Sequence, residues 1–404
     1  MINKRVNGFA LGLIMVFISS PNAYGMQVFD NDASADLFNA AQSGVLKKAE
    51  LAIKNHANPN VCDKNSWSAA HEACTQNNTN ILMFLADNGA SLDVTTNKGL
   101  TLFDVACDSP RTCMVTARKH KELVLYLLSK KLGTLPLLTN ARSILHWACE
   151  KGFIEVVKVL IEEKKIDLEI KDANGHTPLQ VACNFPRISE AVKKWGRWPG
   201  KKKIELERIN KEIGELVFYL LLRGANYSLP LENGHTLVHW ACKTGHLEIL
   251  KFLFDKGMSI TEKTDNNWRL SPLHIASGKG RLNILKFLFE QKDQQCNDIN
   301  GQDQTGKTPL HYAAIEGRAD VVALLLSNKA DPRLKDSDGQ TPYDRAVFRG
   351  NLEAFKNFLT VMSAQRKKGT EFVLSECKTP VDLETFAPGY ARIKKLLLSA
   401  NTTM

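Results

Sequence analysis

The chain has 404 residues, of which 44% are hydrophobic and 24% are charged, and its formal net charge is +10. This length would ordinarily predict two or three domains. A bilayer-spanning helix needs about 20 apolar residues, and no stretch beyond the N-terminal segment reaches this length, which excludes a membrane-spanning class for the rest of the chain.

The N-terminus has the pattern of a cleavable export signal. Lys4 and Arg5 precede an apolar run over 10–18, and residues 23–25, Ala-Tyr-Gly, place small residues where a signal peptidase reads them. An uncleaved anchor is the alternative, but the run has only about half the length that an anchor needs. We therefore expect cleavage after Gly25 and an exported, soluble mature protein that is periplasmic or secreted.

After this segment, one turn motif recurs about every 33 residues: Asn-Gly-His-Thr-Pro-Leu from Asn174, Asn-Gly-His-Thr-Leu from Asn233, Thr-Gly-Lys-Thr-Pro-Leu-His from Thr305 and Asp-Gly-Gln-Thr-Pro-Tyr from Asp338. The small residue after the Ala of each first helix has the same period, with steps of 33, 33, 42, 34, 59, 35, 37 and 33. These residues are Ala41, Cys74, Cys107, Cys149, Cys183, Cys242, Ser277, Ala314 and Val347. A fixed period of this kind predicts one elongated array, because a single copy cannot bury its own apolar face.

The copy at 140–168 indicates how each unit folds. Residues 140–143 supply turn and capping side chains, and 144–149 form a short helix that Gly152 ends. In 155–161 the apolar residues have helical spacing, with Lys158 on the outer face. The unit is therefore predicted to be helix, turn, helix and extended finger.

These residues resemble the ankyrin repeat family, whose consensus reads Asp-x-x-Gly-x-Thr-Pro-Leu-His-x-Ala-Ala and then Gly-His-x-Glu-Ile-Val-x-x-Leu-Leu. Copies at 234–257 and 306–332 match nearly throughout, whereas Asp104 and Gln180 stand where the family usually has His. The resemblance implies an all-α repeat solenoid of nine to ten stacked repeats with short β-hairpin fingers. The predicted domains are a signal peptide 1–25, a short segment 26–33, the repeat domain 34–398 with a degenerate last copy at 378–398, and a tail 399–404.

Two steps exceed the period and predict insertions near 108–119 and 184–212. The larger one is predicted to be a helical hairpin that turns at 196–200, because its apolar residues, Ile188, Val192 and Trp195, share one helical face. Residues 187–211 hold nine Lys or Arg against three Glu, a local net charge of +6. We expect a solvated basic face or, as the sharper alternative, a patch for an acidic protein or an anionic membrane surface. The patch residues are Lys193, Lys194, Trp195, Arg197, Trp198, Lys201, Lys202 and Lys203.

The nine cysteines do not form an evident disulfide framework, although export would permit one. Five of them, Cys74, Cys107, Cys149, Cys183 and Cys242, occupy one equivalent position of the repeat. Stacked helices lie about 8 to 10 Å apart, which is farther than the Cα atoms of a disulfide can be. These five are therefore interpreted as small core residues. Cys62, Cys113, Cys296 and Cys377 fall elsewhere, and a bond from Cys107 to Cys113 stays open.

Histidines near these cysteines suggest a metal site or a nucleophile, since His146 and Cys149, like His239 and Cys242, are three residues apart. A zinc site needs about four converging ligands, whereas these pairs recur along an array. In the ankyrin family this imidazole bonds the turn, so the resemblance implies a structural role. The sequence contains no phosphate-binding loop, Gly-x-Ser-x-Gly or His-Glu-x-x-His motif. We expect no cofactor, no metal and no enzyme activity.

The resemblance implies that the finger tips and the exposed face of the first helices bind a partner protein, so that the concave face supplies the site. The basic insertion favours an acidic partner, and export argues against nucleic acid. Trp67 and Trp268 are the strongest candidates, because we expect these aromatic side chains to be free of core duties and hot spots favour tryptophan. The other family-variable positions are Thr75, Gln76, Glu150, Lys151, His176, Phe185, His235, Lys243, Thr244, Leu270, Lys279, Lys307, Glu316, Gln340 and Arg349. The predicted function is a noncovalent protein-binding scaffold; an enzyme built from the insertions and a membrane-surface adaptor are the alternatives. A signal before ankyrin repeats resembles proteins of host-associated bacteria, which suggests a secreted effector.

Overall fold

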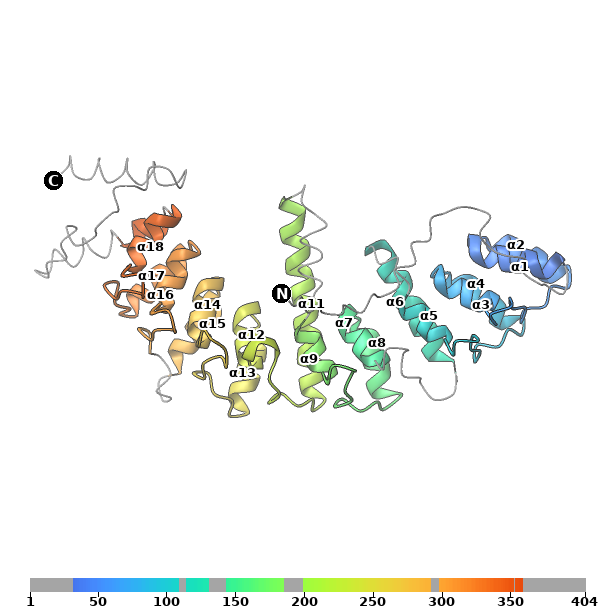
Figure 1. Cartoon of the computed structure of the whole chain (residues 1–404), viewed down its shortest axis with the longest axis horizontal. Helices are drawn as coiled ribbons and strands as arrows, with labels where there is room; N and C mark the ends of the chain where they lie inside the picture. Colours follow the sequence, from blue (N-terminus) through green and yellow to red (C-terminus); the bar gives the residue numbers. More distant parts are fainter. Residues whose placement is uncertain are drawn as a thin grey trace, which may run out of the picture. The chain divides into compact units, whose positions relative to one another are not determined.

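The computed structural model describes residues 32–108, 114–130, 143–184, 199–291, 298–351 and 353–358. Within them the chain is helical, and short helices follow one another in pairs joined by tight turns (Figure 1). The chain divides into two units, 1–139 and 140–404. Among the described residues, no helix is both long and apolar enough to cross a bilayer.

In the first unit, each first helix packs on its own second helix and on the first helix of the next pair, so α1 contacts α2 and α3, and α3 contacts α4 and α5. Helix α1 begins two residues before the predicted start of the repeat domain at 34. The helices are α1 Asp32–Ser43, α2 Leu46–Lys54, α3 Ala69–Thr75, α4 Thr79–Asp87, α5 Leu102–Asp108 and α6 Met114–Ser129.

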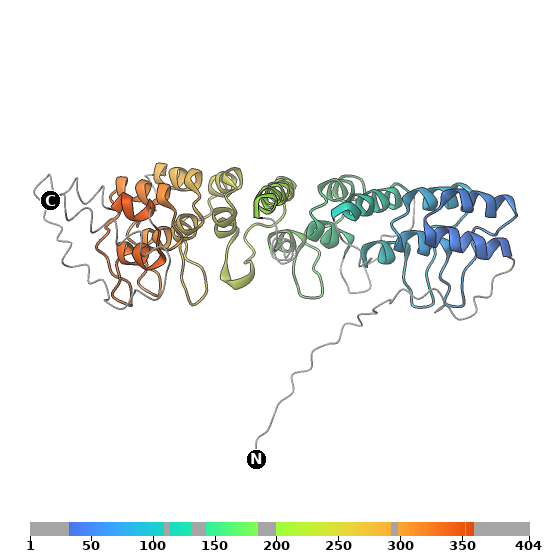
Figure 2. The same cartoon turned by 90° about the horizontal axis from the view of Figure 1, so that it is seen from above.

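The second unit repeats this packing, with the first helices α12, α14, α16 and α18 side by side and the second helices beside them in a separate row (Figure 2). Its helices are α7 Ile144–Lys151, α8 Ile154–Glu162, α9 Pro178–Cys183, α11 Pro199–Leu222, α12 Leu237–Thr244, α13 Leu247–Asp255, α14 Pro272–Lys279, α15 Leu282–Glu290, α16 Pro309–Ile315, α17 Ala319–Ser327 and α18 Pro342–Arg349, with a 3-10 turn at Glu232–Gly234. Residues 353–358 are also helical.

The small residue that marks the period lies in the core, as predicted. Ala41, Cys149, Cys242 and Ala314 have no exposed surface, and the other members of the series are also buried. Burial raises the pKa of the Cys74, Cys183 and Cys242 thiols. None of the five cysteines at this position forms a disulfide with another of them, as predicted. Cys62 is exposed and free, whereas Cys113, Cys296 and Cys377 lie outside the described residues.

In several repeats the recurring histidine joins the first helix to the next finger, although Nε2 of His239 in α12 makes no such bond. In α16 the backbone N–H of Thr308 donates to Nδ1 of His311 at 3.0 Å, and Nε2 of His311 lies 3.0 Å from the carbonyl oxygen of Gln340. Because Nδ1 accepts, Nε2 carries the proton and donates, so the neutral ring uses both nitrogens. His146 and His274 reach the next finger in the same way, through the carbonyls of His176 and Lys307.

Two departures from the consensus perform the same capping with other chemistry. Gln180 accepts the N–H of Thr177 through Oε1 at 2.9 Å and donates through Nε2 to the carbonyl of Pro230 at 2.7 Å. Asp104 accepts both the N–H and the hydroxyl of Thr101. The cap thus needs an acceptor at this position, whereas the link to the next finger also needs a donor, which His and Gln supply and Asp does not.

The larger insertion becomes part of helix α11, which runs from Pro199 to Leu222 and extends beyond its neighbours in the second unit (Figure 1). The predicted turn at 196–200 is therefore wrong for Pro199 and Gly200, which belong to the helix. Proline suits the first position of a helix because the N–H group that it lacks would have no partner within the helix there. Residues 185–198 lie outside the described residues. The smaller insertion likewise contributes 114–119 to the start of α6.

Close contacts hold α11 against the next repeat. A methyl group at Gly214 would lie 2.2 Å from Cε1 of His246, so only glycine admits this ring. His246 stacks on Trp240 with ring centroids 5.1 Å apart, and the indole N–H of Trp240 donates to the carbonyl of Cys183 at 3.0 Å. These contacts join the helices on either side of the insertion.

The fingers are tighter than the predicted β-hairpins. In the described part of the first unit they contain isolated bridges between Cys62 and Ser68 and between Thr95 and Thr101. In the second unit a finger is closed by a single backbone hydrogen bond; for example, the N–H of Asp303 donates to the carbonyl oxygen of Lys307 at 2.9 Å. Five residues leave no room for a longer ladder.

The histidine caps predict acid-sensitive stability. Burial lowers the pKa of His274 to about 4 from its ordinary 6.5. Because the folded value lies below the unfolded one, this contribution to stability is complete above about pH 6.5 and is lost as the pH falls toward 4, by roughly 1 to 3 kcal/mol. His274→Gln should keep both hydrogen bonds, as Gln180 does, and reduce the fall in urea midpoint on acidification. If the urea midpoint of His274→Gln fell as much on acidification as that of the natural protein, His274 would not be a source of the acid sensitivity.

Candidate protein-binding surface

An aspartate at the base of the fingers fixes their shape. The Asp303 carboxylate accepts the N–H groups of Thr305 and Lys307, both at 2.8 Å, and the hydroxyl of Tyr312 at 2.6 Å. Burial alone would raise the pKa of Asp303, but these hydrogen bonds lower it overall. Asp63 and Asp172 accept equivalent pairs of N–H groups. The tips are therefore held before any partner arrives.

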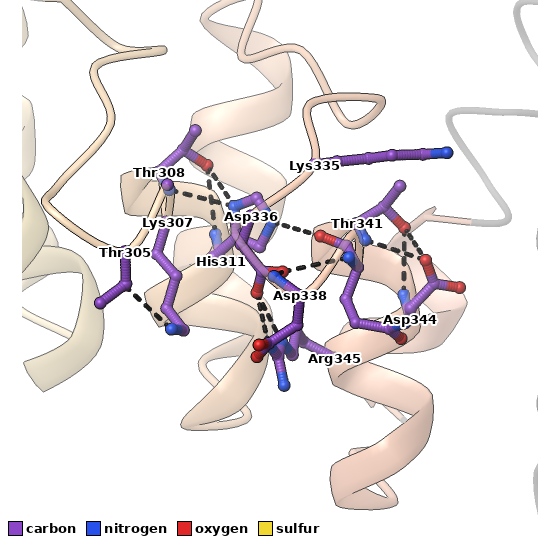
Figure 3. Close-up of polar contacts among 12 residues, drawn as sticks. Thr305, Lys307, Thr308, His311, Lys335, Asp336, Asp338, Thr341, Asp344 and Arg345 are labelled. Carbon is purple, nitrogen blue, oxygen red and sulfur yellow. Dashed lines mark hydrogen bonds and ion pairs between the residues drawn. The ribbon is translucent and has the colours of Figure 1, made fainter.

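The last finger within the described residues, at the base of α18, adds an ion-pair network (Figure 3). Nε of Arg345 donates to the buried carboxylate of Asp336 at 2.7 Å, and its Nη2 also pairs with the exposed Asp338. Asp336 accepts the N–H groups of Asp338 and Gln340 at 3.0 Å each. One guanidinium thus joins α18 to two carboxylates of its finger.

The candidate residues from the sequence divide by exposure and by unit. Trp67, Thr75 and Gln76 lie in the first unit, and the other described candidates lie in the second, so the two tryptophans belong to separate units. Lys243, Trp268, Lys279, Glu316 and Arg349 are exposed. The half-buried candidates are Trp67, Thr75, Gln76, Glu150, Lys151, His176, His235, Thr244, Leu270, Lys307 and Gln340.

Several predicted residues lie outside the part of the chain that the structure describes. Phe185 and the patch residues Lys193, Lys194, Trp195, Arg197 and Trp198 precede α11. Lys201, Lys202 and Lys203 lie in the first turns of α11, but their side chains are outside the described part. The basic patch therefore stays a prediction.

Trp67 has a structural duty that the sequence did not indicate. Its indole N–H donates to Oε2 of Glu72 at 3.2 Å, and its ring lies 5.2 Å from that of His71. Glu72 is buried, so this hydrogen bond satisfies a carboxylate inside the repeat. The expectation of an aromatic side chain free of core duties is thus wrong for Trp67.

Trp268 is 54% exposed and is presented by an enlarged finger. Ten sequence positions separate Thr264 from His274, against eight from Asp303 to His311, so the finger carries two additional residues. Thr264 N–H still closes the loop on Leu270 C=O at 2.9 Å. The additional residues display the indole outward.

Local hydrogen bonds hold this enlarged finger. Oδ1 of Asn266 accepts the N–H groups of Trp268 at 3.0 Å and of Arg269 at 3.2 Å, and Arg269 takes a left-handed φ of 49°. The N–H of Gln304 in the next finger donates to the carbonyl of Trp268 at 3.2 Å. The backbone under the indole is thus fixed on both sides, which lowers the entropy lost on binding.

Phe348, which the sequence analysis did not single out, is 48% exposed at the end of α18. It occupies the position of Lys243 in α12 and of Glu150 in α7, and of Gly278 and Ile315 in α14 and α16. Phe348 is the aromatic residue among these copies, which a comparison position by position would have shown. An exposed phenylalanine beside Arg349 adds an apolar contact to this face.

The described residues contain no group of three or more His, Cys, Asp or Glu side chains that could hold a metal ion. Cys74 and Cys242, three residues after His71 and His239, are buried, and burial raises the pKa of both thiols, so they stay protonated and are poor nucleophiles. The geometry instead provides fixed tips and a row of first helices for noncovalent contact.

A family model described as ankyrin repeats in three copies matches residues 37–133, 112–194, 208–300 and 294–367. The chain belongs to the ankyrin repeat family. Its paired, stacked helices are consistent with about nine repeats, and such repeats typically form protein-binding scaffolds. The predicted tenth copy at 378–398 lies outside both the match and the described residues.

The chain resembles curated proteins of varied size. It is 28% identical to the poly [ADP-ribose] polymerase tankyrase of Caenorhabditis elegans over 90% of this chain but only 17% of that protein. It is 27% identical to the probable 26S proteasome regulatory subunit p28 of Saccharomyces cerevisiae, over 52% of this chain and 81% of that protein. It is 30% identical to the IkB-like protein of African swine fever virus, over 41% of this chain and 79% of that protein. The chain thus spans a small part of the first of these proteins and most of the other two.

The two tryptophans should differ in their effect on stability. Trp268→Ala should change the free energy of unfolding by less than about 0.5 kcal/mol, as exposed substitutions usually do. Trp67→Ala should cost about 1 to 3 kcal/mol, because it leaves the buried Glu72 without its indole donor. Urea unfolding of both variants measures this, and equal losses would contradict the distinction.

Proposed function

We propose that this protein is a noncovalent scaffold that captures another protein through the finger tips and first helices of its second unit. The observation that carries this is Trp268, an exposed indole on a finger whose backbone is fixed by Asn266 and Gln304. A large, rigid aromatic side chain gives contact area at low entropic cost, which is why hot spots favour tryptophan. The proposal assigns no catalytic step to the chain.

We also propose that the protein is exported and acts outside the cytoplasm, as a secreted bacterial effector or a periplasmic protein. The support is the sequence alone: Lys4 and Arg5, the apolar run at 10–18 and the small residues ending at Gly25. In an exported protein the partner would be met in the periplasm or in a host.

Partner capture tests the scaffold. Trp268→Ala should lower recovery of the partner about tenfold or more, as removal of a hot spot does. Leu222→Ala is the matched control, because Leu222 is 61% exposed at the end of α11 and not on a finger. Undiminished capture by Trp268→Ala would contradict the proposal. A variant that keeps substrate turnover would point to an enzyme instead, and one that keeps vesicle binding would point to a membrane adaptor.

Export predicts a defined N-terminus. When the full chain is expressed in a bacterium, mass spectrometry of the exported fraction should find a protein that begins at Met26. Replacing an apolar residue of the 10–18 run with Arg should retain the protein in the cytoplasm with Met1 uncleaved. A full-length protein in the cytoplasm of the unaltered strain would contradict export.

A further inference from the structure

In two successive repeats of the second unit, an arginine follows the glycine that ends the first helix. Arg281 follows Gly280, the end of α14, and Arg318 follows Gly317, just after α16. Each reaches back to the preceding repeat: Nε of Arg281 donates to the carbonyl of Lys243 at 3.2 Å, and Nε of Arg318 to that of Gly278 at 3.3 Å. These carbonyls lie in the last turn of a helix, where cations are favoured.

Glycine makes room for both side chains. Gly245 and Gly280 have left-handed φ values of 92° and 72°. A methyl group would lie 3.0 Å from Cδ of Arg281 at Gly245 and 3.0 Å from Cδ of Arg318 at Gly280. The two guanidinium groups are thus packed over the preceding turn and fixed through Nε, while their Nη groups remain for other acceptors.

No carboxylate neutralises these arginines within the part of the chain that the structure describes, where neither makes an ion pair. They are close enough that, besides burial, the charge of Arg318 lowers the pKa of Arg281. Lys243 and Lys279 are exposed at the ends of the same row of first helices, also without an ion pair among the described residues. Like charges held this close destabilise the free protein and are relieved by an anionic ligand.

We propose that Lys243, Lys279, Arg281 and Arg318, the cation column, bind an acidic, extended polypeptide segment of the partner. This inference rests on the proposed function, since it names the chemistry of the protein that the scaffold captures. The column differs from the basic insertion patch in residues and position. The four side chains of the cation column lie at or just after the ends of α12, α14 and α16, which the structure describes.

The spacing of the column fits an extended peptide. Packed helices are about 8 to 10 Å apart, and a polyproline II segment returns to the same face every three residues, about 9.3 Å along its axis. A carboxylate at every third residue would therefore meet one repeat after another. Arginine can grip a carboxylate with two parallel N–H groups.

The neighbouring residues favour a polypeptide over a nucleic acid. Glu316 is exposed at the corresponding helix end of α16 and would repel a continuous phosphate backbone. Phe348 is exposed on the end of α18, and Tyr312 packs against Gly278, the residue that anchors Arg318. Mixed apolar and acidic neighbours suit a peptide that carries apolar residues between its carboxylates.

The test uses the full chain and a fluorescein-labelled peptide of repeated Glu-Pro-Pro triplets, with Gln-Pro-Pro triplets as the uncharged control. Fluorescence anisotropy at low salt should show binding of the Glu peptide alone. Arg281→Gln combined with Arg318→Gln should weaken it about tenfold or more. Lys286→Gln combined with Lys329→Gln removes the same charge from exposed positions on α15 and after α17 and should change affinity less than about twofold.

Several outcomes would overturn the proposal: equal binding of both peptides, unchanged affinity in the double arginine variant, or tighter binding of a DNA duplex that depends on the same arginines. If the arginine variant does not fold, Lys243→Gln with Lys279→Gln decides, because both side chains are exposed. If Trp268→Ala abolishes partner capture while the double arginine variant captures normally, the scaffold function stands and the cation column is refuted.

Discussion

The structure depends on one repeated polar contact, a neutral side chain that caps its own helix and bonds the next finger. In His311 the Nδ1 atom accepts from Thr308 and Nε2 faces the carbonyl of Gln340. Each copy is too small to bury an apolar face alone, and this contact fixes how neighbouring copies meet. The contact needs one hydrogen-bond acceptor for the cap and one donor for the next finger, and Gln180 supplies both in place of histidine.

Regular stacking permits irregular additions. The small core residue and the cap keep their places while two additional residues enlarge the finger that carries Trp268, and a longer insertion extends α11. The enlarged finger leaves α12 and α14 packed on each other, whereas α9 and α12, on either side of the longer insertion, lack the close packing that the other neighbouring first helices of the second unit make. Binding features can thus vary from copy to copy on a constant support, and the fixed finger under Trp268 and the arginines packed over glycine turns are two such features.

Much of the fold was predictable because the repeat specifies it many times over. The spacing of the Thr-Pro-Leu-His motif identified the helix pairs, and the shared position of Cys74, Cys149 and Cys242 identified core thiols. Prediction failed where a residue departs from the repeat. Trp67 was expected to be free, yet it satisfies Glu72, a contact between side chains that periodicity does not reveal. Pro199 was assigned to a turn, although it begins a long helix.

The sequence by itself determined the family, the pairing of helices, the core positions and the structural role of the histidines, since these follow from a short pattern in which each residue repeats its environment. Only the tertiary structure decided which surface side chains are exposed and which groups they face. Trp268 projects from its finger while Trp67 packs inward, and Arg281 and Arg318 lie together although 37 residues separate them. Such neighbours come from different repeats, so their distance and charge environment arise only when the copies stack.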